Sequence, residues 1–401
     1  MPAVPEVPAV PGVPAVPEVP PGFAGAYEAQ RARFPGRSGW QPVHTVYVPA
    51  DRFSAATVGE WREQATALVA SHLAGPRELA EVFGTPPGLA AAVHARLLLK
   101  LGREPIEDLR IDFEDGYGAR PDPIEDGHVE RAAEAVAALH AAGTLPRRWG
   151  PRVKSFADGD PGRSIRTLAG LVGGVVGRAG ELPAGFTVTF PKVLMEDYLR
   201  QFADVLGRLE AGLGAGLGAG LRFEMQVEAP QTLPFLRAEL AEPGGPLGGR
   251  LAAAHFGVFD YTAALGLPPH EQRLDHPACD HARHVMQTAF AGTGVELSDG
   301  SLAASPASGR AEDVHALWRR HAELVRHSLR HGFYQGWDMH PSHLVSRFAT
   351  VYAFHLARYD SYRERVRAWE ERRQAGDGVM DEPATVRALA AALDRADAAL
   401  P

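Results

Sequence analysis

Short apolar runs alternate with stretches of helical periodicity along most of this chain of 401 residues. Eight runs have the length and the β-branched or aromatic content of buried strands. They cover residues 43–48, 109–113, 152–156, 187–190, 221–227, 254–259, 295–298 and 334–339. Most are separated by segments with helical periodicity, such as 126–142, 164–176, 196–213 and 311–331. Eight such units are what a closed (β/α)8 barrel requires, so the pattern predicts an α/β protein with a TIM barrel. An open, doubly wound sheet is the alternative.

The two ends of the chain differ from this alternating region, which we place at residues 40–345. Residues 1–24 repeat Val-Pro with Ala, Gly or Glu, and prolines at this density favour a polyproline II or disordered tail without chemistry. After the last strand, residues 342–374 and 382–400 have helical character. We therefore expect a helical extension over 346–401 that packs against the barrel or against a neighbouring subunit of a homo-oligomer.

Composition and charge limit the class of protein. With 45% hydrophobic and 22% charged residues, the chain can bury a large core, as one α/β domain with additions does. A net charge of −8 is spread along the sequence without a basic stripe, which argues against nucleic acid or an anionic membrane as the main partner. Cys279 is the single cysteine, and the chain shows neither an apolar run of membrane-spanning length nor the pattern of a signal peptide. These features are typical of a cytoplasmic protein.

Two acidic residues, Glu228 and Asp260, each follow a predicted strand and precede helix-like sequence. In a TIM barrel the loops at the carboxyl ends of the strands carry the chemistry. A carboxylate at the end of a core strand is poorly solvated unless a cation neutralises it, and Mg2+ or Mn2+ takes oxygen ligands of this kind. We therefore predict that Glu228 and Asp260 hold a divalent metal ion. The alternative is that each acid caps the following helix or pairs with an arginine.

Further charged residues stand near the ends of other predicted strands. They are Glu114, Asp115, Arg152, Lys192 and His340. We interpret Glu114 and Asp115 as residues that hold metal-bound waters or orient Arg152, while a helix-capping role beside the following glycine stays open. The planar fork of Arg152 fits a substrate carboxylate, although an ion pair with Glu114 would also satisfy it.

These residues belong to motifs whose order resembles that of a known superfamily. In chain order the motifs are Tyr47-Val48-Pro49-Ala50-Asp51-Arg52, the acidic turn 112–116, Arg152-Val153-Lys154-Ser155, Pro191-Lys192-Val193, Val227-Glu228-Ala229, Gly257-Val258-Phe259-Asp260 with Leu265-Gly266, and Met339-His340-Pro341-Ser342. The chain thereby resembles the citrate lyase β-subunit-like aldolases, the HpcH/HpaI superfamily, which includes malyl-CoA lyases. The resemblance covers residues 43–344, and its weight comes from the order of the seven motifs because no single motif is specific.

The resemblance implies a Mg2+-dependent TIM barrel that cleaves or forms a carbon–carbon bond next to a carboxylate. The substrate would be a small oxo- or hydroxy-acid, free or as a CoA thioester. By motif position Glu228 and Asp260 look like the metal ligands, and Arg152 looks like the arginine that binds the substrate carboxylate. Gly257, Asp260 and His340 look like residues that border the substrate.

Two departures from the superfamily pattern leave the substrate open. Pro230 stands in the turn after Glu228, where many members have a residue whose backbone amide faces the substrate, and proline has no amide hydrogen to donate. Gln335-Gly336 stands where a Gly-Lys pair is usual. The acidic turn at 112–115 and the Glu228-Ala229-Pro230 turn are also similar to malate synthases, which run the related condensation. A condensing enzyme of that kind and a ligand-binding barrel without turnover are therefore the alternatives.

The implied reaction breaks a bond through an enolate that the metal ion stabilises as a Lewis acid. The proton carrier is open between Asp115, Asp338 and His340, and we favour an acid because His340 can serve a structural hydrogen bond instead. Lys192 is expected to help electrostatically. A Schiff base on Lys192 or Lys154 is the competing route, but it would leave the predicted metal carboxylates without a role.

One cluster of histidines stands apart from these motifs. His276, Asp280, His281 and His284 lie in one short stretch, and Asp280 with His284 has the i, i+4 spacing of helical metal ligands. The stretch has no third ligand at a clear position, and Asp-His-Pro at 275–277 is typical of the start of a loop. The sequence therefore favours an ordinary structural stretch over a zinc site, and because the stretch follows Asp260 it is also a candidate for the rim of the pocket.

Overall fold

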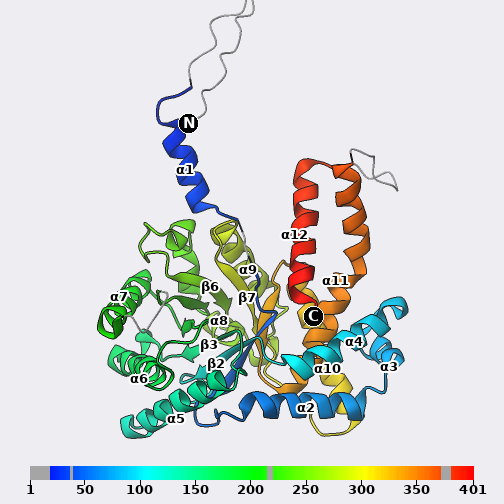
Figure 1. The fold of residues 1–401 in the computed structure, drawn as a ribbon, viewed down its shortest axis with the longest axis horizontal. Helices are drawn as coiled ribbons and strands as arrows, with labels where there is room; N and C mark the ends of the chain where they lie inside the picture. The colour runs from blue at the N-terminus through cyan, green and yellow to red at the C-terminus, as the bar shows by residue number, and fades with distance from the viewer. Residues whose placement is uncertain (1–18, 37–38, 215–219, 372–380) are drawn as a thin grey trace, which may run out of the picture.

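Parallel strands close into a barrel in the computed structural model, which describes residues 19–36, 39–214, 220–371 and 381–401 (Figure 1). The strands are β1 (His44–Pro49), β2 (Asp108–Asp112), β3 (Arg148–Arg152), β4 (Val188–Phe190), β5 (Phe223–Val227), β6 (Leu251–Phe256), β7 (Glu296–Ser301) and β8 (Gln335–Asp338). Each strand pairs with the next along the chain, and β8 pairs with β1. The predicted TIM barrel is confirmed, and closure excludes the open sheet.

Helices cover the outside of the barrel or extend outward from it (Figure 1). They are α1 (Phe23–Arg33), α2 (Thr57–His72), α3 (Pro76–Phe83), α4 (Pro87–Arg103), α5 (Asp122–Ala141), α6 (Pro161–Ala179), α7 (Glu196–Leu213), α8 (Val258–Ala264), α9 (Pro277–Phe290), α10 (Ala311–Arg330), α11 (Pro341–Glu370) and α12 (Pro383–Ala399). The predicted helices at 126–142, 164–176, 196–213 and 311–331 correspond to α5, α6, α7 and α10. Between β1 and β2 the chain forms α2 to α4, of which α2 and α4 pack against α11.

Three strands end three or four residues away from their predicted ends, and one of them, β7, ends at Ser301 rather than at residue 298. β3 ends at Arg152 rather than beginning there. Gly150 and the proline after it concealed this strand, because both residue types are rare inside strands. A Cβ at Gly150 would lie 2.0 Å from the carbonyl oxygen of Thr187. Glycine is therefore required here, because the backbone segment that carries Thr187 comes this close. β6 ends at Phe256 rather than at residue 259 because the chain turns into α8.

Buried charges cross the interior of the barrel between β2 and β5. The Nη2 atom of Arg110 lies 2.6 Å from Oε2 of Glu224, and its Nε donates to Oγ1 of Thr189 at 2.9 Å. Arg110 also pairs with Asp108, and all four side chains are fully buried. Because each charge has a partner, this network is compatible with a closed interior, and removing one member would leave a buried charge unpaired.

The C-terminal extension begins as the last helix of the barrel. α11 runs without interruption, and most of its residues up to His355 are buried, whereas its second half runs outward beside α12 (Figure 1). The predicted boundary at residue 346 therefore falls within one continuous helix. Within the described ranges, no helix combines the length and the apolarity needed to cross a membrane.

Most of the predicted N-terminal tail, residues 1–18, lies outside the described residues. The chain that follows forms α1, which has no buried residue and extends away from the barrel (Figure 1). Arg33 at the end of α1 pairs with Glu239, at 3.2 Å, and with Glu242. These ion pairs connect α1 to the segment between β5 and β6.

Candidate active site

A cavity of about 550 Å³ opens at the C-terminal end of the barrel strands. Six of the residues singled out in the sequence line it, namely Asp115, Arg152, Glu228, Gly257, Asp260 and His340. Glu114 and Lys192 complete the group through hydrogen bonds with Asp115. The structure therefore brings all the predicted site residues together, as the convergence of strand ends in a barrel requires.

Glu228 directly follows β5 and is only 4% exposed. Its Oε1 accepts a hydrogen bond from the backbone N–H of Lys192 at 2.6 Å, and among the described residues it forms no ion pair with a side chain. A Cβ at Gly257 would lie 2.5 Å from Cβ of Glu228, so glycine is required for the two segments to pack. Burial, together with the charges of Glu114 and Asp260, raises the pKa of Glu228 to about 8. The surroundings of Glu228 therefore hold too little positive charge to stabilise its ionised form.

Asp260 lies in the first turn of α8, which corrects its predicted place at the end of a strand. Its side chain is 45% exposed and lines the cavity, with Oδ2 3.9 Å from Nζ of Lys192. Burial raises the pKa of Asp260, while the charge of Lys192 opposes the change. The two predicted metal ligands thus border the same cavity from a strand end and from a helix.

Lys192 connects several of these acids. Its backbone φ of 48° is in the left-handed region, which is uncommon for a residue other than glycine. Its backbone N–H donates to Glu228, and its Nζ contacts Glu114 and lies 2.6 Å from Oδ1 of Asp115. Burial opposes the change, but the neighbouring acids raise the pKa of Lys192. A lysine held in its charged form is a poor nucleophile, so this geometry does not favour a Schiff base.

Glu114 and Asp115 share Lys192 but differ in environment. Glu114 is buried, and burial raises its pKa to about 7 although Arg152 opposes the change. Asp115 lines the cavity and is half exposed; burial acts to raise its pKa, but hydrogen bonds with Lys192 and Glu114 lower it overall. The two neighbouring carboxyl groups therefore titrate apart, a pattern typical of acid–base pairs.

Arg152, the last residue of β3, is held by acids on one side. Its Nε and Nη2 donate to the two oxygens of Asp112 at 2.7 and 2.6 Å, and its Nη1 lies 3.3 Å from Oε2 of Glu114. The guanidinium also lies 4.9 Å from the ring centroid of Tyr47. The ion pair with Glu114 that the sequence left open is present, and Asp112 occupies the fork that was expected to be free for a substrate.

His340 and Asp338 lie near each other in sequence but have different surroundings. His340 lines the cavity and caps α11, since its Nδ1 accepts the N–H of Ser342 at 3.2 Å. Asp338 is fully buried, where its carboxylate accepts from Nη2 of Arg347 at 2.7 Å and lies 3.0 Å from Nδ1 of His44. Asp338 does not line the cavity, which leaves the other two proposed proton carriers there.

The cavity also includes Trp337 and Ser301, which sequence reasoning missed, and Tyr47, which begins one of the sequence motifs but was given no role. The rings of Tyr47 and Trp337 are 5.0 Å apart, and Nε1 of Trp337 donates to Nδ1 of His255 at 3.1 Å. In sequence these aromatic residues are typical of core. Strand alternation, which turns every second barrel residue inward, is the only signal that would have marked them.

The donor set of the cavity fits a hard divalent cation. Glu228 and Asp260 offer carboxylate oxygens, which are the ligands that Mg2+ and Mn2+ prefer. The two positively charged side chains nearby already form ion pairs: Arg152 pairs with Asp112, and Lys192 pairs with Glu114 and Asp115. Among the described residues, Glu228 is therefore left without a positively charged side chain as an ion-pair partner.

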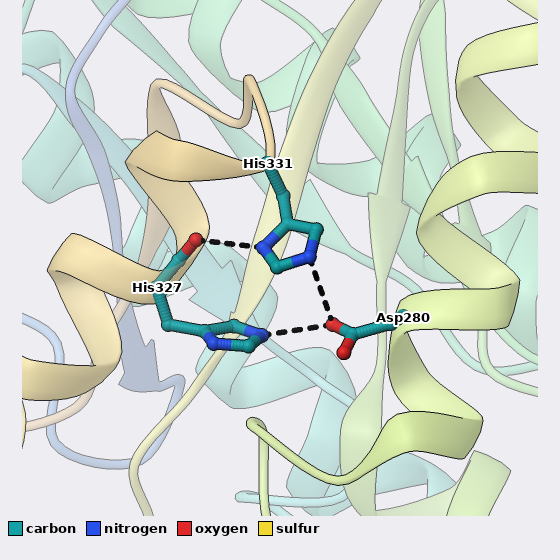
Figure 2. Close-up of side chains that lie close together, drawn as sticks. All are labelled: Asp280, His327 and His331. Carbon is teal, nitrogen blue, oxygen red and sulfur yellow. Dashed lines mark hydrogen bonds and ion pairs between the residues drawn. The ribbon is translucent and has the colours of Figure 1, made fainter.

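The predicted histidine stretch forms the start of α9, and none of its four residues lines the cavity. His276 caps this helix, since its Nδ1 accepts the backbone N–H two residues later at 3.1 Å. Asp280 does not pair with His284 but contacts His327 and His331 at the end of α10 (Figure 2).

The fold and the cavity define the class of this protein: a TIM barrel with carboxylates, an arginine and a lysine around a cavity at the C-terminal end of its strands. The structure is similar to that of a citrate lyase from Burkholderia xenovorans LB400, with a TM-score of 0.59 and 18% identity over 89% of this chain and 92% of that chain. It is also similar to malate synthase from Haloferax volcanii, with a TM-score of 0.52 and 15% identity over 90% of this chain and 99% of that chain. These likenesses show that the chain shares the fold of these two structures.

The chain belongs to the family described as a domain of unknown function, DUF6986, whose model matches residues 24–399. No protein of curated function matches its sequence. The match extends from α1 through the barrel to α12, so the C-terminal helices are part of what defines the family.

Proposed function

We propose that this protein is an enzyme, a divalent-metal-dependent carbon–carbon lyase or aldolase. It acts next to the carboxylate of a small oxo- or hydroxy-acid, free or as a CoA thioester. The observation that carries the proposal is the buried Glu228, which shares the cavity with Asp260 and has no ion-paired side chain in the described residues. A buried carboxylate without a partner is costly, so a bound cation accounts for its position.

Glu228 and Asp260 would hold Mg2+ or Mn2+. The Oε1 atom of Glu228 is fixed by the backbone N–H of Lys192, which leaves Oε2 for a cation. When bound, such an ion supplies a Lewis acid for the negative charge that develops on the substrate in an enolate. Gly257 lets Glu228 lie against the start of α8, which carries Asp260.

Arg152 would orient the substrate carboxylate. Asp112 occupies Nε and Nη2, and Oε2 of Glu114 lies 3.3 Å from Nη1, so a substrate carboxylate would bind on the Nη1 side and share it with Glu114. The group is held rigidly and its pKa is raised, since its acidic partners outweigh the effect of burial. A fixed positive charge at the cavity wall favours the state in which negative charge develops on the substrate.

Asp115 and Glu114 would handle the proton. Asp115 faces the cavity, and its lowered pKa keeps its carboxylate free to accept a proton. Glu114, with a pKa of about 7, takes up or releases a proton near neutral pH. Lys192 contacts both carboxylates and keeps them together. His340 is used as a helix cap and borders the substrate.

The test is turnover of a panel of 4-hydroxy-2-oxo acids, malyl-type thioesters and citryl-type thioesters, with Mg2+, with Mn2+ and with a chelator. Release of pyruvate or acetyl-CoA is measured, and the reverse condensations are assayed with the same enzyme. We expect metal-dependent turnover of one class, abolished by the chelator. Asp260→Asn should reduce it by at least about a hundredfold, whereas Asp197→Asn, which changes an exposed acid on α7, should not.

The panel also separates the alternatives. Turnover found only in the condensing direction supports the malate-synthase-like reaction. Binding of a panel acid that depends on Mg2+, without any turnover, supports a ligand-binding barrel. Turnover that survives both the chelator and Asp260→Asn would overturn the metal assignment.

A further inference from the structure

Three potential metal ligands meet on the outside of the barrel, where α9 approaches the end of α10. Asp280 comes from α9, and His327 and His331 come from the last turn of α10 and the residue after it. Oδ1 of Asp280 lies 2.8 Å from Nε2 of His327 and 3.5 Å from Nε2 of His331 (Figure 2). One ligand atom from each residue falls within 4.8 Å of the other two, the spacing that a single bound ion requires.

The two histidines are already arranged as ligands. They are four residues apart, so they lie on the same face of the helix, with ring centroids 4.4 Å apart. The Nδ1 of His331 lies 3.0 Å from the carbonyl oxygen of His327, and a hydrogen bond donated from Nδ1 leaves the lone pair of Nε2 toward Asp280 (Figure 2). Metal-binding histidines are typically fixed in this way, by a hydrogen bond from the ring nitrogen that does not bind the metal.

The cluster is accessible and has room for another donor. Each of the three side chains is 25% exposed, so an ion can reach the group without opening the core. His284, one turn after Asp280 on α9, is exposed, and its ring centroid lies 5.8 Å from that of His331. A fourth coordination position can therefore be filled by His284 or by water.

Arg283 is the main charge that opposes a cation at this position. Its Nη1 lies 2.6 Å from Oδ1 of Asp280, and it is anchored by Asp299 and by the carbonyl oxygen of Leu274. In the described part of the chain, the side-chain hydrogen bonds of Asp280 involve Oδ1 and not Oδ2, so the carboxylate keeps one oxygen for a metal ion. The arginine is expected to weaken binding and to hold the carboxylate in place.

We propose that Asp280, His327 and His331 form a binding site for a divalent transition-metal ion such as Zn2+, separate from the carboxylate cavity. Two imidazoles and one carboxylate suit Zn2+, Co2+, Ni2+ or Cu2+ better than Mg2+, which prefers oxygen ligands. The bound ion would link α9 to α10. Because Arg283 and Ser328 both donate to Asp299 of β7, this link would also restrict motion on one side of the barrel.

The experiment is a calorimetric titration of the full chain, without an affinity tag, with ZnCl2 in the presence of excess Mg2+. We expect one Zn2+ per chain at this site and a Zn2+-induced rise in Tm. His331→Ala and His327→Ala should each weaken Zn2+ binding by at least about tenfold and remove the rise in Tm. His281→Ala is the matched control, because this histidine is exposed on α9 and is not one of the three ligands.

Circular dichroism checks that the variants fold, and His331→Gln provides a second change at the same position if His331→Ala does not. Absence of Zn2+ binding by the unaltered protein would overturn the proposal and leave an ion-pair cluster only. Binding of equal affinity in the unaltered protein and in both histidine variants would overturn it as well, because the ion would then bind elsewhere.

Discussion

The carboxylates around the cavity and the Asp280 cluster on α9 and α10 differ in how their charges are balanced. Glu228 is buried and, within the described ranges, accepts a single hydrogen bond, from the backbone N–H of Lys192; burial raises its pKa to about 8. Asp280 accepts from Arg283 and contacts two histidines, and although burial opposes the change, these partners lower its pKa. The cavity is short of positive charge by itself, whereas the outer cluster is balanced before any ion binds.

This difference indicates what each region can gain from a metal ion. At the cavity, a cation removes an existing electrostatic penalty, so binding should be strongly coupled to stability and to function. At the outer cluster, an ion must compete with Arg283, so its effect should be smaller and confined to the contact between the two helices. The difference in ligands has a chemical consequence too, because oxygen donors favour Mg2+ and imidazoles favour Zn2+.

The largest expected effect tests whether the two regions are independent. Glu228→Gln should lower metal-dependent turnover by at least about a thousandfold, or about 4 kcal/mol of transition-state stabilisation, because it removes a charged ligand at the reacting centre. The same variant should bind Zn2+ at α9 and α10 with unchanged affinity in the calorimetric titration. Loss of Zn2+ binding in Glu228→Gln would show that Zn2+ binds in the cavity, and that the cluster on α9 and α10 is not a separate site.

The next effect is on stability, and it should have opposite signs in the two regions. The folded-state pKa of Glu228, about 8, lies above its ordinary value of 4.5. The folded protein therefore retains a proton that the unfolded chain loses, and this contribution is full below pH 4.5 and disappears as pH rises through 8. Without metal, Glu228→Gln should raise the free energy of unfolding by about 1 to 3 kcal/mol above pH 8, and should change it little below pH 4.5.

Asp280→Asn should instead lower the free energy of unfolding. The pKa of Asp280 is lowered in the folded state, so its contribution is present above its unfolded-state pKa and is lost as pH falls. Urea denaturation at several pH values measures both variants. Added Mg2+ should stabilise the unaltered protein and not Glu228→Gln. A decrease in stability for Glu228→Gln at pH 8 would contradict the view that this carboxylate lacks a partner.

The smallest effect distinguishes a histidine of the cavity from the histidines of the outer cluster. His340 caps α11, so His340→Ala should cost about 1 kcal/mol of stability and His340→Asn should restore it, because asparagine is a good N-cap. Both variants lack the imidazole and should raise KM equally if this side chain borders the substrate. An unchanged KM in His340→Asn would restrict His340 to the cap, and neither variant should alter Zn2+ binding.

Much of the barrel could be predicted because its signals are local. Strand candidates, helix periodicity and the order of the units each depend on residues close in sequence, and the structure confirms the closed barrel. The exception was β3, where Gly150 is required by the approach of Thr187 from the neighbouring strand. No local pattern reports a contact of that kind.

The charged residues of the candidate site were predictable, but their pairings were not. Acids and bases at strand ends were expected to converge, and they line one cavity. Only the structure showed that Arg152 pairs with Asp112. Only the structure showed that Asp260 lies on α8 rather than on a strand. Both depend on where the chain turns at the rim of the barrel, which differs by a few residues from what propensity suggests.

By itself, the sequence determined the barrel and the set of charged residues at the ends of its strands. Tertiary structure alone decided which charges are neutralised: that Glu228 has no ion-paired side chain among the residues that the structure describes, and that Asp280 meets His327, 47 residues away, rather than His284 one turn along its own helix. The physical reason is that periodicity and strand-end position are properties of neighbouring residues. The protonation and metal affinity of a side chain depend instead on burial and on charges that packing brings within a few ångströms.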